Sequence, residues 1–368
     1  MQDTQPYRRP TQSRAERIRR AAPRRRRRAN WRRRIGLFVL LLLVVAVTGV
    51  VLVWQRAAAF NDAVSTESAL SMRLFGPLSG GDRVNVLLLG YSDESRDGAF
   101  LSDSMNVISI DRATDTSTMI PIPRDLWVEG VPEVPQNMKI NEAFRIGTYE
   151  AGLEHGAELA AKAVTQVTGL EIHGWISLDF QGFEAMVDAL DGITLENPTT
   201  FDYTWDENSY FAGDFPNTFE AGTLRLNGQQ ALDYARSRYT SVVAESSDFA
   251  RLIRQQRVLQ AIRSEVVGWQ ALPRGLAVSE SLAGHMRTNL PVLDLAMLSG
   301  KIDVDRRVEL LEDEILAAST NTLGQYILVV IGQATTIDYS PLHEYIDAAL
   351  SEPIPTSTSP SPSSPSVP

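Results

Sequence analysis

The sequence predicts an α/β protein preceded by one N-terminal transmembrane helix, and three observations support this. Residues 35–54 (IGLFVLLLLVVAVTGVVLVW) form a charge-free apolar run that is long enough to span the hydrocarbon core of a bilayer. Val84–Gly90 (VNVLLLG) is continuously apolar, as a strand buried on both faces would be. Beyond it, strand-like and helix-like segments alternate to about residue 350, which is typical of an α/β domain.

Residues 1–34 form a basic arm in front of the apolar run. They hold fourteen arginines against Asp3 and Glu16, a net charge of +12, so the rest of a chain with a total of −10 carries −22. We expect this arm to be disordered and cytoplasmic, because basic residues stay on the cytoplasmic side of a membrane span. The protein would then be a single-pass protein of the cell membrane with its main domain outside. A cleaved signal peptide is the alternative, since Ala57–Ala59 offers small residues for cleavage.

Composition excludes several functions for the body of the protein. An acidic body is a poor general partner for nucleic acid, and anionic membrane lipids account for the arginine arm, so we expect no specific nucleic-acid partner. The absence of cysteine excludes disulfides, thiolate metal sites and cysteine catalysis. The histidines show no H-E-x-x-H spacing, and the sequence contains neither a G-x-S-x-G elbow nor a Walker loop.

The domain boundaries follow from changes in composition. Residues 55–82 are predicted to be a stalk and residues 83–351 one extracytoplasmic domain. Residues 352–368 (EPIPTSTSPSPSSPSVP) have too few core-forming side chains to fold and should be a disordered tail rich in Pro, Ser and Thr.

Within the domain, periodicity predicts the following elements in order. Strands are predicted over 84–90, 105–111, 118–123, 172–178 and 193–196. Helices are predicted over 150–168, 180–190, the segment that leads to Arg236, and 248–269. Residues 126–148 are predicted to be a proline-containing loop. Residues 199–220 combine polar residues with Tyr203, Trp205, Tyr210 and Phe211, and such a segment could line a groove for a sugar or a lipid, or pack as a cover loop.

Asp233–Gln256 (DYARSRYTSVVAESSDFARLIRQQ) has the strongest pattern of a binding site. Arg236 and Arg238 are predicted to close one helix, and Ser247 to cap the next. Guanidinium groups from two helices suit a polyanion, because each planar group can bind two oxygens. An exposed, salt-bridged pair of helices is the alternative.

The second of these helices is predicted to have a polar stripe. With about 100° per residue, Asp248, Arg251 and Gln255 fall on one narrow face. The buried face is expected to consist of Phe249, Leu252, Ile253 and Leu259, with Arg254 and Arg257 pointing elsewhere.

Further polar residues stand at the ends of predicted strands. Asp93 lies in the loop after the first strand, Asp103 precedes the second, and Arg124 follows the third. Because ligand sites of α/β proteins lie at strand ends, these residues are candidates for the same site.

Four sequence blocks, in this order and behind one membrane anchor, resemble the LytR-CpsA-Psr (LCP) family of cell-envelope phosphotransferases. They are VNVLLLGYSD with LSDSM, IPIPRD, KIN at Lys139–Asn141, and LNGQQALDYARSR with SDFARLIRQQ. The resemblance covers residues 83–267 well and continues more loosely to residue 350. It implies an α-β-α layered fold in which helices flank a central mixed β-sheet, with an active site outside the membrane.

The resemblance also implies an activity. The family transfers a glycopolymer from an undecaprenyl-pyrophosphate carrier to peptidoglycan and forms a phosphodiester link. The expected partners are therefore a polyprenyl-pyrophosphate-linked glycan, peptidoglycan and membrane lipid, and the expected cofactor is magnesium, with manganese as an alternative. A pyrophosphatase side activity fits the same site. The transferred polymer stays open between teichoic acid, capsular polysaccharide and an arabinogalactan-type polymer.

Carried over position by position, the resemblance assigns roles to named residues. Asp93 and Asp103 match the family's magnesium-associated aspartates, and either could deprotonate the acceptor hydroxyl. The residues expected to act in catalysis are Asp93, Asp103, Arg124 and Arg238. The residues expected to bind pyrophosphate are Arg124, Lys139, Arg236, Arg238, Asp248, Arg251 and Gln255. Magnesium and arginines would act by positioning and charge neutralisation, without a protein nucleophile.

Two positions depart from the family pattern. Leu101 stands where members often have an arginine before the Ser-Asp pair, and Val128 stands where many have a second arginine after IPRD. These departures motivate an alternative function, a non-catalytic envelope regulator that binds polyprenyl pyrophosphate.

Overall fold

The computed structural model describes residues 51–352 except for short gaps at 52, 69–70, 75, 77–80, 95–97, 135, 206, 267–270, 302–305, 311–313 and 333–336. The chain divides into two compact units, Met1–Ala57 and Ala58–Pro368. In the first unit the described residues, 51 and 53–57, are helical. The predicted basic arm, most of the predicted membrane span and the tail after residue 352 lie outside the described residues. Across the part of the chain that is described, no helix combines the length and apolarity needed to cross a membrane.

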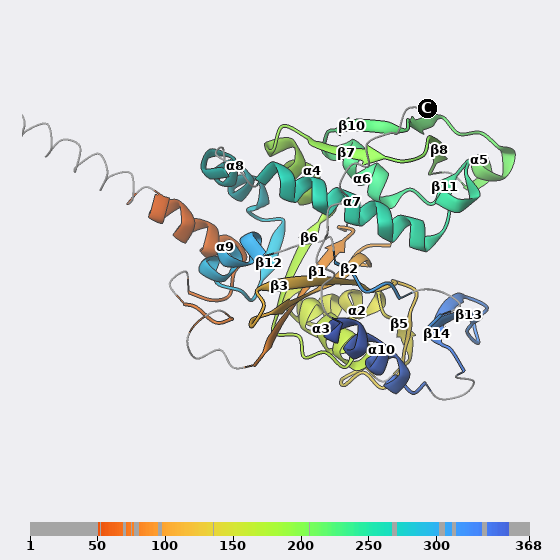
Figure 1. The fold of residues 1–368 in the computed structure, drawn as a ribbon, viewed down its shortest axis with the longest axis horizontal. Helices are drawn as coiled ribbons and strands as arrows, with labels where there is room; N and C mark the ends of the chain where they lie inside the picture. The colour runs from red at the N-terminus through yellow and green to blue at the C-terminus, as the bar shows by residue number, and fades with distance from the viewer. Residues whose placement is uncertain are drawn as a thin grey trace, which may run out of the picture. The chain divides into compact units, whose positions relative to one another are not determined.

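A five-stranded mixed sheet forms the centre of the second unit, with the strand order β12-β6-β1-β2-β3 (Figure 1). Strand β1 is parallel to β6 and antiparallel to β2, and the outer strands β3 and β12 are antiparallel to their neighbours. The strands are β1 (Arg83–Tyr91), β2 (Ser102–Asp111), β3 (Thr116–Pro121), β6 (Gly174–Asp179) and β12 (Met286–Thr288). The predicted α/β fold with a central mixed sheet is therefore confirmed.

Strand β1 is buried on both faces, as its unbroken apolar sequence predicts. Leu87 and Leu89 belong to the larger hydrophobic core, whereas Val84 and Val86 belong to a second cluster. Because side chains alternate along a strand, these pairs point to opposite faces of the sheet. Helices must therefore cover both faces.

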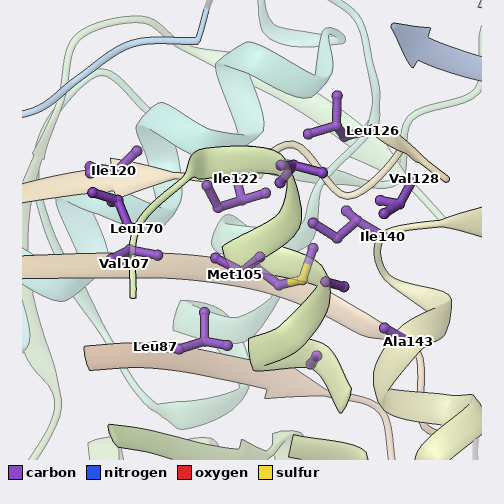
Figure 2. Close-up of a cluster of buried hydrophobic side chains, with 14 of the residues drawn as sticks. Leu87, Met105, Val107, Ile120, Ile122, Leu126, Val128, Ile140, Ala143 and Leu170 are labelled. Atoms are coloured by element: carbon purple, nitrogen blue, oxygen red, sulfur yellow. The ribbon is translucent and has the colours of Figure 1, made fainter. Parts of the chain in front are cut away.

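One face is covered by α2 (Glu142–Ala151), α3 (Leu153–Thr168) and α10 (Ser340–Ser351), which lie together in Figure 1. Figure 2 shows the core at this face, which contains Leu87, Met105 and Val107 from the sheet and Leu126, Val128 and Ile140 from the segment after β3. Two short hairpins complete this side of the unit. They are β4 (Trp127–Val128) with β5 (Met138–Lys139), and β13 (Leu316–Thr320) with β14 (Tyr326–Val330).

The predicted loop over 126–148 followed by a single helix was wrong at this point. Helix α2 starts already at Glu142, and Gly152, with φ at 97°, separates it from α3. The two helices then pack closely at glycines, since a Cβ on Gly147 would lie 2.8 Å from the Gly156 Cα. A ten-residue helix has weak periodicity of its own, and packing against α3 stabilises it.

The other face carries α4 (Phe180–Ala189), α6 (Gly228–Arg236) and α7 (Asp248–Val266), with α8 (Ala271–Leu282) against α4. Helix α9 (Val292–Lys301) also packs here, through Leu298. A separate core joins α4, α6 and α7 to a layer of short strands. That layer contains β7 (Ile193–Asn197), β8 (Phe201–Thr204), α5 (Glu207–Ala212), β9 (Asn217–Phe219), β10 (Gly222–Leu226), β11 (Tyr239–Thr240) and the 3₁₀ turn η1 (Val243–Glu245).

Much of the segment predicted as a stalk packs on the domain in this structure. Val64 and Leu74 are buried. The buried carboxylate of Asp294, in the first turn of α9, accepts hydrogen bonds from the backbone N–H groups of Arg73 and Leu74, both at 2.9 Å. From Ala58 onward, this segment therefore contributes to the second unit.

Side-chain caps fix where the helices of the site begin. The Asp179 carboxylate accepts from the Gly182 N–H at 2.7 Å at the start of α4, and Asn227 and Gln230 form a capping box at the start of α6. The Ser247 hydroxyl accepts from the Ala250 N–H at 3.0 Å, so the predicted cap of α7 is confirmed.

Replacing Gly228 with alanine should destabilise the packing of α6 on α4. A Cβ at this position would lie 2.2 Å from the Glu184 carbonyl oxygen, and backbone atoms cannot move aside as a flexible side chain can. We expect a loss of about 1–3 kcal/mol in the free energy of unfolding, measured by denaturant titration. Gly300→Ala in α9, where nothing lies within 4 Å of the added Cβ and φ is not positive, controls for the added methyl group alone. An unchanged midpoint for Gly228→Ala would contradict this close approach.

Candidate functional site

An apolar cavity of about 190 Å³ lies between the sheet and helices α4, α6 and α7. Leu88 and Ile176 line it from the sheet, and Phe183, Leu232 and Leu259 line it from the helices. The cavity can therefore hold a hydrocarbon chain.

The polar lining of the cavity comes from β2, α6 and α7, namely Ser104, Asn106, Arg236 and Gln255. The Ser104 hydroxyl donates to Gln255 Oε1 at 3.1 Å, and Asn106 Nδ2 donates to Ser104 Oγ at 3.1 Å. Because Ser104 follows Asp103, these residues connect the cavity to the charged groups beside it.

The charged groups form a network of alternating sign. Arg124 Nη1 donates to Asp103 Oδ1 at 2.6 Å, and Arg236 Nη2 lies 3.8 Å from Asp103 Oδ2. Asp125 accepts from Arg124 Nε at 3.3 Å and from Lys139 Nζ at 2.6 Å. Three cations and two carboxylates leave one formal positive charge, which favours an anionic ligand.

Backbone hydrogen bonds bring the IPRD and KIN blocks to the start of β2. The Ser102 N–H and hydroxyl both donate to the Asn141 carbonyl at 3.2 Å, and the Asn141 N–H donates to the Arg124 carbonyl at 3.3 Å. The two blocks therefore meet Asp103 through the chain itself, and Asp125 then holds the side chains of Arg124 and Lys139.

Arg236 is positioned by aromatic rings. It is the last residue of α6, and its guanidinium carbon lies 4.3 Å from the ring centroid of Phe180 and 5.5 Å from that of Trp205. Such cation–π contacts restrict the rotamers of a long side chain. The predicted helix end at Arg238 was wrong, since Arg238 lies beyond α6, where it is exposed.

Helix α7 brings Gln255 into the site, where its Nε2 lies 3.5 Å from the Asp103 carbonyl oxygen. Arg251, one turn earlier on α7, is also buried, but it does not line the cavity. Asp248 is the first residue of α7, and its side chain lies outside what the structure describes.

The predicted buried face of α7 was only partly right. Leu252 is buried, whereas Phe249, Ile253 and Leu259 are half-buried. Arg254, predicted to point away, has an exposed fraction of 0%. A helical wheel places charged side chains outside by default, and only the neighbouring elements reveal a partner inside.

Arg254 binds the carboxyl-terminal end of α6. Its Nε donates to the Tyr234 carbonyl at 3.1 Å, and its Nη2 donates to the Ser237 carbonyl. Its Nη1 donates to the Glu245 carboxylate at 2.6 Å. Burial lowers the pKa of the Arg254 guanidinium, and the Glu245 carboxylate opposes that shift. Arg254 therefore fixes the segment that carries Arg236 and Arg238, a role that the sequence prediction missed.

Asp93 lies in the loop after β1, beside the first turn of α4. Its Oδ2 accepts a hydrogen bond from Gln181 Nε2 at 3.2 Å. The contacts of Asp103 among the described residues lead to Arg124, Arg236 and Gln255, and do not include Asp93. The structure thus gathers Asp103, Arg124, Lys139, Arg236 and Gln255 into one network, with Asp93 on the adjoining loop.

The carboxylate of Asp103 could coordinate a metal ion that also binds oxygens of a ligand. Within the described ranges, no three Asp, Glu or His side chains converge as a ready-made metal site. Asp103 Oδ2 accepts no hydrogen bond from any described residue, so it retains lone pairs for a cation. Magnesium in proteins usually takes one or two carboxylates, with phosphate oxygens and water as its other ligands. Asp103 supplies one such carboxylate, so an ion held here would take most of its other ligands from phosphate and water.

The two departures from the family pattern have different surroundings. Val128 is fully buried in the hydrophobic core, where Figure 2 shows it near Leu126 and Ile140. Leu101 is half-buried. An arginine at Val128 would therefore require a different arrangement of β4.

Known proteins are similar to this chain along most of its length. The model of the LytR_cpsA_psr family matches residues 48–337. The polyisoprenyl-teichoic acid–peptidoglycan teichoic acid transferase TagU of Oceanobacillus iheyensis is 26% identical over 310 residues, which is 82% of this chain and 91% of that protein.

Solved structures share the fold. The crystal structure of B. subtilis TagV aligns with a TM-score of 0.54 at 22% identity and covers 73% of this chain and 96% of its own. The structure of TagT bound to LI-WTA aligns with a TM-score of 0.52 at 21% identity and covers 78% of this chain and 97% of its own.

Proposed function

The chain belongs to the LytR-CpsA-Psr family, and on that premise we propose that it is a membrane-anchored phosphotransferase of the cell envelope. Its donor is a glycopolymer on an undecaprenyl-pyrophosphate carrier, its acceptor is peptidoglycan, and its product is a phosphodiester link. The name of the O. iheyensis relative describes a transfer of this kind, with teichoic acid as the polymer. The anchor leaves the N-terminus in the cytoplasm and the domain outside.

The observation that carries this proposal is the apolar cavity beside a network with excess positive charge. A polyprenyl pyrophosphate matches this arrangement, because its long hydrocarbon chain suits the apolar cavity and its compact polyanion suits the positive network. Each CH₂ group that leaves water contributes about 0.8 kcal/mol, so even part of the chain supplies considerable binding energy. Arg124 and Arg236 lie 2.6 Å and 3.8 Å from the two Asp103 oxygens, and in this proposal they bind phosphate oxygens near that carboxylate.

The reaction is one displacement at phosphorus. The acceptor hydroxyl oxygen bonds to the phosphorus that carries the glycan, and the bond from this phosphorus to the bridging oxygen breaks. Undecaprenyl phosphate leaves, and the proton of the hydroxyl passes to Asp93 or Asp103. Arg124, Arg236 and Arg238 stabilise the charge that grows on the leaving phosphate.

Other residues support this geometry. Lys139 and Arg124 both donate hydrogen bonds to Asp125, so Lys139 helps to hold the carboxylate that positions Arg124. Arg251 and Gln255 on α7 bind the pyrophosphate of the donor. Asp248, the first residue of that helix, belongs to the same binding set. Asp103 and Asp93 are the residues that would hold magnesium or manganese, and such an ion would supply further charge neutralisation.

The second candidate function is a regulator that binds polyprenyl pyrophosphate without turnover. The absence of arginines at Leu101 and Val128 favours it, because each lost guanidinium reduces stabilisation of the departing phosphate. Binding would then persist because the cavity and the Asp103 network remain.

Metal removal tests the proposed function directly. We expect the full-length protein in detergent to release undecaprenyl phosphate from an undecaprenyl-pyrophosphate-linked glycan when peptidoglycan fragments and magnesium are present. Chelation with EDTA should abolish release, and added magnesium should restore it. Lipid binding without turnover, even with metal and acceptor present, would support the regulator instead. A donor with a single phosphate serves as the control and should not react.

A further inference from the structure

Trp205 is an exposed aromatic side chain beside the charged network. It follows β8, and 45% of its surface is exposed. Its ring centroid lies 5.5 Å from the guanidinium carbon of Arg236. A ligand phosphate bound by Arg236 would therefore have the Trp205 ring within reach of its next substituent.

Packed aromatic neighbours fix the orientation of Trp205. Its ring meets Tyr203 edge to face, with centroids 5.8 Å apart at an interplanar angle of 77°. Tyr203 is buried and stacks on Phe219 at 4.9 Å, and its hydroxyl lies 3.3 Å from the Asp233 carboxylate. The Trp205 ring therefore packs against a fixed, buried neighbour while nearly half of its surface remains exposed to solvent.

A role in holding Arg236 does not account for this exposure. Phe180 is buried and contacts the same guanidinium more closely, at 4.3 Å. If the Trp205 ring only held Arg236, burying this ring as well would make the fold more stable, because apolar surface left in water contributes nothing to stability. The open surface of Trp205 is therefore available to a ligand.

We propose that Trp205 is a stacking platform for the sugar that is attached directly to the donor pyrophosphate. This proposal rests on the proposed function and deepens it by assigning the first sugar to a residue. A pyranose ring presents C–H groups on one face, which pack against the flat face of an indole, while its hydroxyl groups stay in water. The phosphate bound at Arg236 holds the sugar at this position.

The test compares two lipid probes on the full-length protein in detergent. The probes are undecaprenyl pyrophosphate and undecaprenyl-pyrophosphoryl-N-acetylglucosamine, and the measurement is the dissociation constant of each. An aromatic contact contributes about 0.5–1.5 kcal/mol, so Trp205→Ala should weaken binding of the glycosylated probe roughly two- to twelvefold. Binding of the sugar-free probe should stay unchanged, and Trp205→Phe should recover most of the loss.

Tyr149→Ala provides the control. Tyr149 is an aromatic residue of α2, which covers the opposite face of the sheet from α6 and Arg236, and it is 67% exposed, so its loss should affect neither probe. An equal loss for both probes with Trp205→Ala would overturn the platform, because Trp205 would then act through Arg236. No loss for either probe would overturn it too. If the wild-type protein bound neither probe, the proposed function itself would fail, which is a distinct result.

Discussion

Replacing Asp103 with asparagine is expected to reduce the rate of glycopolymer transfer by about 10²–10³-fold at saturating donor. The amide keeps the size of the side chain but removes the negative charge that Arg124 and Arg236 share. It also removes the anionic oxygen that is proposed to hold magnesium. Because the cavity is untouched, the donor should still bind through its hydrocarbon chain, and the loss should appear mainly in kcat.

Asp111→Asn is the control for this experiment. Asp111 ends the same strand, far along β2 from Asp103, and pairs with Arg83 at 3.2 Å. Hydrogen bonds from the Thr114 and Ala113 backbone lower the pKa of Asp111, so its side chain is ionised at neutral pH. We expect its transfer rate to stay close to that of the wild type. An Asp103→Asn variant that kept a near wild-type kcat would remove Asp103 from the proposed mechanism.

Replacing Arg254 with methionine is expected to cost about 3–5 kcal/mol in the free energy of unfolding. The change leaves the Glu245 carboxylate without its partner, and it leaves the carbonyls of Tyr234 and Ser237 without a buried donor. Breaking a buried pair by removing one partner costs more than the pair contributes, because the remaining groups stay desolvated. Denaturant unfolding followed by circular dichroism measures the loss.

Arg257→Met separates this effect from the general loss of an arginine on α7. Arg257 is half-buried and donates one hydrogen bond, from Nη1 to the Tyr234 hydroxyl at 3.3 Å. Its loss should cost only about 1 kcal/mol. Similar losses for the two variants would mean that Arg254 does not hold the end of α6. In that case the contacts with Phe180 and Trp205 would position Arg236.

Local patterns in the sequence predicted a large part of this fold. The unbroken apolar run of β1 predicted a strand buried on both faces, and the structure confirms it. Ser247 predicted the start of α7, and the structure confirms this cap. These features depend on residues only a few positions apart, so their energetics can be read from a short stretch of chain.

The candidate site could be predicted as a set of residues but not as an arrangement. The sequence blocks pointed to Asp103, Arg124 and Arg236, which the structure places in one network. The role of Asp125 as a shared anchor for Arg124 and Lys139 appears only in the structure, because Lys139 comes from a separate hairpin.

The sequence by itself determined the strand at the centre, the start of α7 and the family of this protein. The tertiary structure alone decided that Arg254 points inward to the end of α6, that α2 and α3 pack at glycines, and that Trp205 stands open beside Arg236. The physical reason is the distance along the chain. Helix caps and hydrophobic periodicity depend on neighbours in sequence. The role of a buried charge or an exposed aromatic ring depends on partners that folding brings together from distant segments.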